Sequence, residues 1–204
     1  MYVYFCYLCN YMDYIVKTNI KRFALLKLYV NKNDPDLVKV YKEHIDKHNR
    51  SIQTDPFPNS GFDVFFPKEK LFDIELYTTM VSMDIKTEMV YYDNTSEYQE
   101  PSAFYVFPRS SMSKTPLMLS NHTGIIDCGY RGWLLAAFRW LNNIPVRVND
   151  LTNEYIVEKH ARLLQICHPS LCPIVVELVE SEEELSKTIR DDGAFGSTGK
   201  IGAT

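Results

Sequence analysis

Short hydrophobic runs separated by polar turns dominate the chain from residue 61 onward. The runs read GFDVFF, ELYTTMVSM, IKTEMVYY, SAFYVF, LMLS, WLLAAFRWL, YIVEKHARLLQI and PIVVELVE. Aromatic and β-branched residues are frequent in them, and turn-forming residues lie between them at fairly even spacing. This pattern predicts many short strands, and therefore an all-β barrel or sandwich.

The pattern before residue 61 predicts one strand and one helix. Residues 22–30, RFALLKLYV, are suited to a first strand. A helical insertion of about residues 33–49 follows, with Asp34 as its N-cap and Pro35 in its first turn. We expect the polar residues up to 60 to form a loop.

Both ends of the chain differ from this central part. We expect an N-terminal extension over residues 1–21, a β domain over 22–189 and a C-terminal arm over 190–204. The first apolar stretch has only about 16 residues, fewer than the roughly 20 that span a bilayer, and it lacks the basic start of a signal peptide. Our hypothesis is that residues 1–11 are dispensable. Segment 181–190 is acidic and predicts one helical turn or a linker, and the Gly-rich end predicts a mobile arm.

Composition and charge narrow the function. The 204 residues carry a net charge of −4, with 46% hydrophobic and 24% charged residues. An acidic chain without a basic stripe argues against a broad nucleic-acid footprint, and we expect neither nucleic acid nor a membrane as a partner. Five cysteines at irregular positions favour a reducing compartment over a disulfide framework. His44 and His48 lie among Lys, Asp and Asn, which predicts a solvated helix face rather than a metal site.

The segment of residues 121–132, NHTGIIDCGYRG, predicts a strand pair folded around a tight polar tip. Asp127 and Tyr130 are the two side chains at this tip that can do chemistry. Two interpretations remain open from these residues alone. Asp127 is either a turn residue bonded to its own backbone, or it points at a flat ligand held by the hairpin.

Four further polar clusters interrupt the hydrophobic pattern. They are SGFDVF at 60–65, FPRSSMSK at 107–114, HARLLQI at 160–166 and GAFGSTG at 193–199. Each alone has an ordinary explanation, such as a cap, a solvent-facing Gln or a flexible tail. Together they offer groups that bind phosphate oxygens, stack on a base and orient a water molecule.

In this order, the five clusters resemble the five motifs of the trimeric, all-β deoxyuridine triphosphatases (dUTPases). The resemblance implies a distorted jelly-roll-like β-barrel with a short helical insertion and a mobile C-terminal arm. It also implies a homotrimer with shared active sites. The SSM and GSTG sequences are similar to those in enzymes from large DNA viruses.

The resemblance assigns roles residue by residue. Asp127 matches the residue that activates the attacking water, and Tyr130 the residue that excludes a 2′-hydroxyl. Asp63 matches a position near magnesium, which it contacts indirectly through water. The implied substrate-binding residues are Arg109, Ser110, Ser111, Asn121, Gly124, Ile126, Tyr130, Gln165, Arg190, Phe195, Gly196, Ser197 and Thr198. The implied reaction is Mg²⁺-assisted hydrolysis of dUTP to dUMP and pyrophosphate, which removes dUTP from the DNA precursor pool and supplies dUMP for thymidylate synthesis. The expected location is the cytoplasm or nucleus of the host cell, without secretion.

The chain departs from the family pattern at two places. His160 and Ala161 replace the usual Gly-Asp before the Arg of the fourth motif, and Cys128-Gly129 replaces a more polar pair. Two alternatives therefore stay open. A dCTP deaminase shares the fold, but Ala137 stands where that chemistry needs a Glu. A non-catalytic nucleotide-binding or interaction protein on the same fold is the second alternative.

Overall fold

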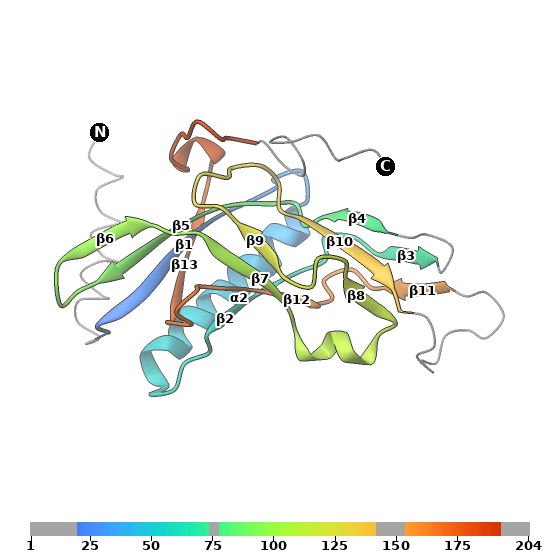
Figure 1. Cartoon of the computed structure of the whole chain (residues 1–204), viewed down its shortest axis with the longest axis horizontal. Coiled ribbons are helices and arrows are strands. Elements are labelled where there is room, and N and C mark those ends of the chain that lie inside the picture. Colours follow the sequence, from blue (N-terminus) through green and yellow to red (C-terminus); the bar gives the residue numbers. More distant parts are fainter. Residues whose placement is uncertain (1–19, 74–77, 142–153, 193–204) are drawn as a thin grey trace, which may run out of the picture.

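The computed structural model describes residues 20–73, 78–141 and 154–192. These residues form thirteen strands, one long helix and two 3₁₀ turns (Figure 1). The strands are β1 (Arg22–Val30), β2 (Gly61–Val64), β3 (Lys70–Asp73), β4 (Thr79–Ser82), β5 (Ile85–Asp93), β6 (Tyr98–Pro101), β7 (Phe104–Pro108), β8 (Leu117–Leu119), β9 (Gly124–Ile126), β10 (Leu135–Trp140), β11 (Glu154–Val157), β12 (Leu164–Cys167) and β13 (Ile174–Val179). The helical elements are α2 (Pro35–Thr54), η1 (Ser110–Lys114) and η2 (Glu182–Glu184).

The strands are arranged in four small sheets that surround a common core. Their strand orders are β13-β1-β5-β6, β4-β10-β8, β11-β3 and β2-β12-β7-β9. Among the described strands, all pairings are antiparallel except that of β1 with β13. The all-β prediction is therefore confirmed, and so are the strand over residues 22–30 and the single helical turn within 181–190.

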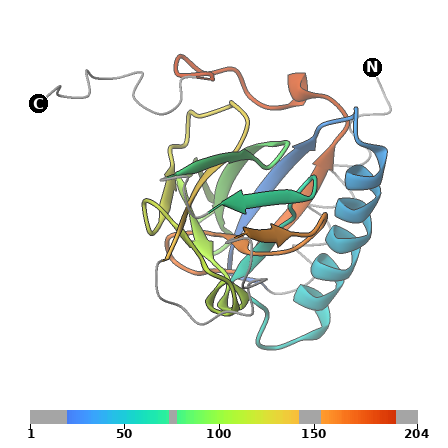
Figure 2. The ribbon, with the colours of Figure 1, turned by 90° about the vertical axis from the view of Figure 1, so that its right-hand side faces the viewer.

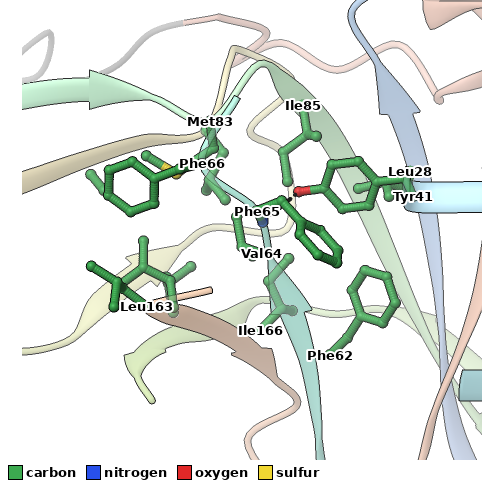
Figure 3. Close-up of a cluster of buried hydrophobic side chains, with 14 of the residues drawn as sticks. Leu28, Tyr41, Phe62, Val64, Phe65, Phe66, Met83, Ile85, Leu163 and Ile166 are labelled. Carbon is green, nitrogen blue, oxygen red and sulfur yellow. Dashed lines mark hydrogen bonds between the residues drawn. The ribbon is translucent and has the colours of Figure 1, made fainter. Parts of the chain in front are cut away.

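Large aromatic side chains fill the space between the sheets. Phe66, Phe72 and Phe138 are fully buried and lie 5.4–6.5 Å apart between ring centroids. Figure 3 shows how side chains from β1, α2, β2 and β12 meet in this core. Tyr41 is buried at its edge, where its hydroxyl accepts a hydrogen bond from the Phe65 amide at 3.1 Å. This bond ties the helix to the end of β2.

The helix α2 lies along one flank of the molecule beside β1 and β13 (Figure 2). Asp34 caps it as predicted, because its carboxylate accepts the Leu37 amide at 3.0 Å. The helix runs to Thr54, so the predicted loop from residue 49 begins later than expected. The reason is tertiary: the Asn49 carboxamide bonds both the amide and the carbonyl of Val176 on β13, at 3.0 and 2.8 Å.

One other sequence prediction is wrong. The run of residues 155–166 is two strands, because His160 adopts a positive φ of 64° in the turn between them. β11 pairs with β3, whereas β12 pairs with β2 and β7.

Among the described residues, no helix has both the length and the apolar character needed to span a membrane.

Candidate active site

One group of predicted site residues meets on the sheet β2-β12-β7-β9. Asp63 on β2 lies opposite Gln165 on β12, and Gln165 lies opposite Phe107 on β7. Arg109 follows directly after β7, where its amide donates to the Leu163 carbonyl at 2.8 Å. Antiparallel pairing thus brings residues from three separate motifs into one row.

The carboxylate of Asp63 organises this group. Its two oxygens lie 2.6 Å from Arg109 Nε and 3.0 Å from Arg162 Nη1. Arg109 Nη1 and Ser111 Oγ both donate to the Arg162 carbonyl at 2.9 Å. Two guanidinium groups on one carboxylate leave an excess positive charge, which suits the binding of an anion. We call Asp63, Arg109, Ser110, Arg162 and Gln165 the Asp63 cluster.

Arg162 was missed as a site residue by the sequence analysis. Its guanidinium is partly exposed and contacts both Asp63 and the face of Phe65, 6.0 Å from the ring centroid. Its place in the fourth motif, three residues before Gln165, was the available signal.

A cavity of about 580 Å³ opens beside the Asp63 cluster. Its lining residues are His44, His48, Asn59, Ser60, Gly61, Asp63, Phe107, Arg109, Ser110, Gln165, Cys167 and Leu171. Gly61 lies at this wall, where a Cβ would come within 2.5 Å of Gln165 Oε1 and would displace that side chain. The cavity therefore combines four predicted phosphate-side residues with a second wall from the helix and the loop that follows it.

The predicted solvated face at His44 and His48 is wrong, because both imidazoles face the β-domain. His48 is buried, and its Nε2 lies 2.8 Å from the Ile174 carbonyl. Both rings lie 5.1 Å from the Phe62 ring. Burial lowers the pKa of His44 to about 4, although the nearby carboxylate of Asp63 opposes this, and burial also lowers the pKa of His48. Both side chains are therefore neutral at pH 7.

Asp127 lies in a turn directly after β9. The Tyr130 amide donates to the Asp127 carbonyl at 3.0 Å, which closes the turn. The predicted strand pair is wrong: β9 pairs with β7, whereas β10 belongs to another sheet. In the segment between these strands, Tyr130 is buried and donates its hydroxyl to the Trp133 carbonyl at 2.7 Å. Burial raises the pKa of Tyr130. We call residues 127–132 the Asp127 turn.

The remaining predicted residues of this region surround the turn. Asn121 is exposed before β9, and its carbonyl accepts the Thr123 amide at 2.6 Å. Gly124 lies against Val106, where a Cβ would come within 3.2 Å. Ile126 is opposite Phe104. Among the described residues, β9 is an edge strand that pairs only with β7. Its other edge is therefore available to a ligand.

Asp127 forms an ion pair with Arg190 near the C-terminal end of the described chain. The two side chains are 47% and 43% exposed, so water screens their attraction. Arg190 was predicted to reach phosphate, and here it covers the predicted catalytic carboxylate instead. Phe195, Gly196, Ser197 and Thr198 lie outside the described residues.

The Asp127 turn and the Asp63 cluster do not meet within one chain. The register places Asp127 beyond Phe104 at one end of β7, whereas Arg109 follows the other end. Six residues of extended strand correspond to about 20 Å at roughly 3.3 Å per residue. In addition, Arg109 is directed toward Asp63 on β2, at the edge of the sheet opposite to β9. A single nucleotide phosphate cannot contact both groups of one chain.

The described residues fit a magnesium ion only if a bound nucleotide supplies most of its ligands. No group of three or more His, Cys, Asp or Glu side chains suited to a metal occurs in the described part of the chain. Both oxygens of Asp63 are already paired with arginines. Asp63 therefore fits an indirect contact through water, and a triphosphate would have to supply most of the ligands.

The chain is similar to several known nucleotide hydrolases. No family model matches the chain. The deoxyuridine 5′-triphosphate nucleotidohydrolase of a Hydrogenobaculum species is 31% identical over 142 residues, which cover 69% of this chain and 83% of that protein. The enzyme of the same name from Alkaliphilus metalliredigens is 28% identical with the same coverage. That of Escherichia phage T5 is 35% identical over 94 residues, 46% of this chain and 56% of that protein.

Solved structures of phage proteins are also similar to the chain. A variant dUTPase of Staphylococcus bacteriophage 80alpha, determined with dUpNHpp, is 20% identical, with 70% of this chain and 87% of that chain covered and a TM-score of 0.39. The dUTPase of phage phi11 of S. aureus is 18% identical, with 66% and 89% covered and a TM-score of 0.41.

Proposed function

The chain belongs to the dUTPase family, and we propose that it hydrolyses dUTP to dUMP and pyrophosphate by attack of water on the α-phosphorus. The observation that carries this proposal is the Asp63 cluster, with two arginines on one carboxylate beside a cavity of about 580 Å³. Such a cluster suits a polyphosphate, because phosphate oxygens can accept hydrogen bonds from an arginine that now pairs with Asp63. The enzyme would remove dUTP from the DNA precursor pool and supply dUMP.

We assign the phosphate contacts to the Asp63 cluster. Arg109 supplies charge, while Ser110 and Gln165 supply neutral polar groups at the cavity. Ser111 lies beside this cluster, because its hydroxyl and Arg109 Nη1 share the Arg162 carbonyl. Preorganised cations and dipoles of this kind stabilise the negative charge that develops during attack. Magnesium bound to the triphosphate would neutralise further charge, with Asp63 near it through water.

Asp127 is the residue that we assign to the attacking water. A carboxylate that orients water and accepts its proton is typically worth about 10²–10⁴ in rate. For this role Asp127 must lose its ion pair with Arg190, and the substrate phosphates offer that guanidinium a stronger anionic partner. The turn and β9, with Asn121, Gly124 and Ile126, are the proposed pyrimidine-binding edge.

Tyr130 and the arm complete the proposed site. Tyr130 would exclude a 2′-hydroxyl, although its own hydroxyl is held by the Trp133 carbonyl. Phe195 would stack on the base, which is worth roughly 1–3 kcal/mol. Gly196, Ser197 and Thr198 would close over the phosphates and exclude water, as lids do.

The separation of about 20 Å between Arg109 and Asp127 along β7 supports shared sites. A nucleotide held by the Asp63 cluster of one chain needs Asp127 from another chain. We therefore propose a homotrimer in which each site combines residues of neighbouring chains. A closed ring of three is one of the symmetric arrangements open to such a head-to-tail contact.

The test is release of pyrophosphate from dUTP, dCTP, dTTP and UTP, with and without magnesium. Of the four nucleotides, we expect only dUTP to release pyrophosphate rapidly, and we expect magnesium to accelerate this release. Conversion of dCTP to a uracil nucleotide would instead identify a deaminase. Binding of dUTP without any turnover would leave a binding protein, and either of these results would reject the proposed hydrolysis.

A further inference from the structure

Arg131 is a buried cation that lies directly behind the Asp127 turn. Its side chain is only 7% exposed. Nη1 donates to the carbonyls of Cys128 and Tyr130 at 2.9 and 2.8 Å. The guanidinium thus fixes the turn from its inner side, since both acceptors belong to the loop that carries Asp127.

The same side chain also holds the segment that leads to the C-terminal arm. We call residues 186–192 the arm root. Arg131 Nε donates to the Ser186 carbonyl at 3.0 Å, and Nη2 donates to Ser186 Oγ at 2.8 Å. The Arg131 amide donates to the Asp191 carbonyl at 2.7 Å. Arg131 therefore contacts the arm root near both of its ends.

One further side-chain bond joins the arm root to the turn, and a second stiffens the root itself. The hydroxyl of Thr188 donates to the Gly129 carbonyl and accepts the Asp191 amide, the latter at 3.0 Å. Tyr130 and Asp191 also form a parallel bridge. With these contacts in place, Arg190 lies over Asp127. The position of the arm root and the state of the carboxylate are thus linked by direct contacts.

Glu88 on β5 anchors this assembly to the β-domain. It is 6% exposed, and its Oε1 lies 3.6 Å from Arg131 Nη2. Its Oε2 accepts the Ser186 amide at 2.8 Å. A buried charge of this kind is tolerated because its partner is present, so loss of Arg131 would leave Glu88 unpaired inside the protein.

We propose that Arg131 is a positioning residue, which holds the Asp127 turn and the arm root in a fixed relation and thereby sets the position of Asp127. We call the contacts of Arg131 with the turn and the arm root the clamp. The effect of the clamp on catalysis rests on the proposed hydrolysis of dUTP, whereas the existence of the clamp does not. Lysine cannot replace it, because only the planar guanidinium presents several donors in a rigid fork. Catalysis would therefore depend on a residue that touches neither the substrate nor the water.

The first experiment is native-state digestion of the full-length protein with trypsin, which cleaves after Lys187 and Arg190 in the arm root. Arg131→Lys should accelerate cleavage at these two sites by at least about tenfold, because cleavage follows the population in which the root is released. Arg22→Lys is the matched control: this arginine is 66% exposed and pairs with Asp93. It should leave the cleavage rate unchanged.

The second measurement is the steady-state kinetics of the same variants with dUTP. Arg131→Lys should lower kcat by about tenfold or more and raise KM by a smaller factor, because phosphate binding by the Asp63 cluster is intact while the Asp127 turn is misplaced. Unchanged cleavage of the arm root in folded Arg131→Lys would overturn the proposal. So would unchanged kcat with accelerated cleavage, because the clamp would then be structural only.

If Arg131→Lys does not fold, Glu88→Gln provides the same test. It keeps an acceptor for the Ser186 amide and removes the charge that faces the guanidinium. The arm root should again be cleaved faster, and a rate equal to that of the unsubstituted protein would overturn the proposal. Absence of dUTP hydrolysis in the unsubstituted protein would reject the proposed function, while the digestion would still decide whether the clamp exists.

Discussion

Mixing two inactive variants should restore activity if each site combines two chains. Arg109→Ala removes the main cation of the Asp63 cluster, and Asp127→Asn removes the proposed water-orienting carboxylate. The two positions lie about 20 Å apart along β7 in one chain. Each variant alone should lose about 10²-fold or more in turnover. The chains are to be mixed in equal amounts under conditions that exchange subunits.

The size of the recovery follows from counting. A site is intact when the chain that supplies Arg109 carries the Asp127 substitution and its neighbour carries the Arg109 substitution. In a randomly assembled ring about one quarter of the sites satisfy both conditions. Pyrophosphate release from dUTP should therefore rise to about a quarter of the unsubstituted rate.

A second mixture provides the control. The doubly substituted chain mixed equally with unsubstituted chain should also give about one quarter if sites are shared, but about one half if each chain carries a complete site. The reasoning is refuted if the first mixture stays as inactive as its components while the second retains about half of the activity.

Three further predictions follow from individual contacts. Asn49→Ala should lower the free energy of unfolding by about 2–4 kcal/mol in urea titration, because the amide and carbonyl of Val176 lose their partner; Thr54→Ala, exposed on the same helix, should change it by less than about 0.5 kcal/mol, and equal effects would contradict the assigned role. Burial lowers the pKa of His44 from 6.5 to about 4, so the unfolded chain binds more protons in this range and stability is lost as pH falls below 6.5. In thermal melts, His44→Gln should remove about 1 kcal/mol of the loss between pH 7 and 5, after allowance for partial exposure, and an unchanged slope would speak against a neutral buried imidazole. Truncation before Gly193 should abolish pyrophosphate release while native mass spectrometry still detects the trimer; normal rates would exclude a role for the arm.

The hydrophobic pattern predicted those parts of the fold that local sequence determines. The strand over 22–30 and the capped helix start at Asp34 are examples, since alternating burial and a capping carboxylate are encoded by neighbouring residues. The strands β3 and β6 were missed. β6 is exposed along its whole length at a sheet edge, so its residues carry no apolar signal.

The mispredicted features depend on distant contacts. The helix extends past residue 49, where Asn49 bonds the backbone of β13 and Ile52 packs against Phe23, Leu25 and Val175. His44 and His48 are polar by type, yet the spacing from Tyr41 through both histidines to Ile52 places them on the buried face of the helix. That spacing was a signal in the sequence, and the charged neighbours obscured it.

For the site, motif order predicted which residues belong to it but not how one chain arranges them. Asp63, Arg109 and Gln165 come together because three antiparallel strands align them. Arg131 was not singled out, since its role depends on Ser186 and Glu88, which are distant in sequence. The separation of Arg109 from Asp127 follows from strand register, which a motif list does not contain.

The most direct test of the account is the Asp127→Asn variant, with Asp192→Asn as a charge-matched control nearby. We expect Asp127→Asn to reduce pyrophosphate release from dUTP by about 10²–10⁴-fold while the affinity for a non-hydrolysable dUTP analogue stays close to that of the unsubstituted protein. Asp192→Asn should leave both quantities nearly unchanged. Full turnover by Asp127→Asn would contradict the assignment of the catalytic carboxylate, and with it the mechanism proposed for this chain.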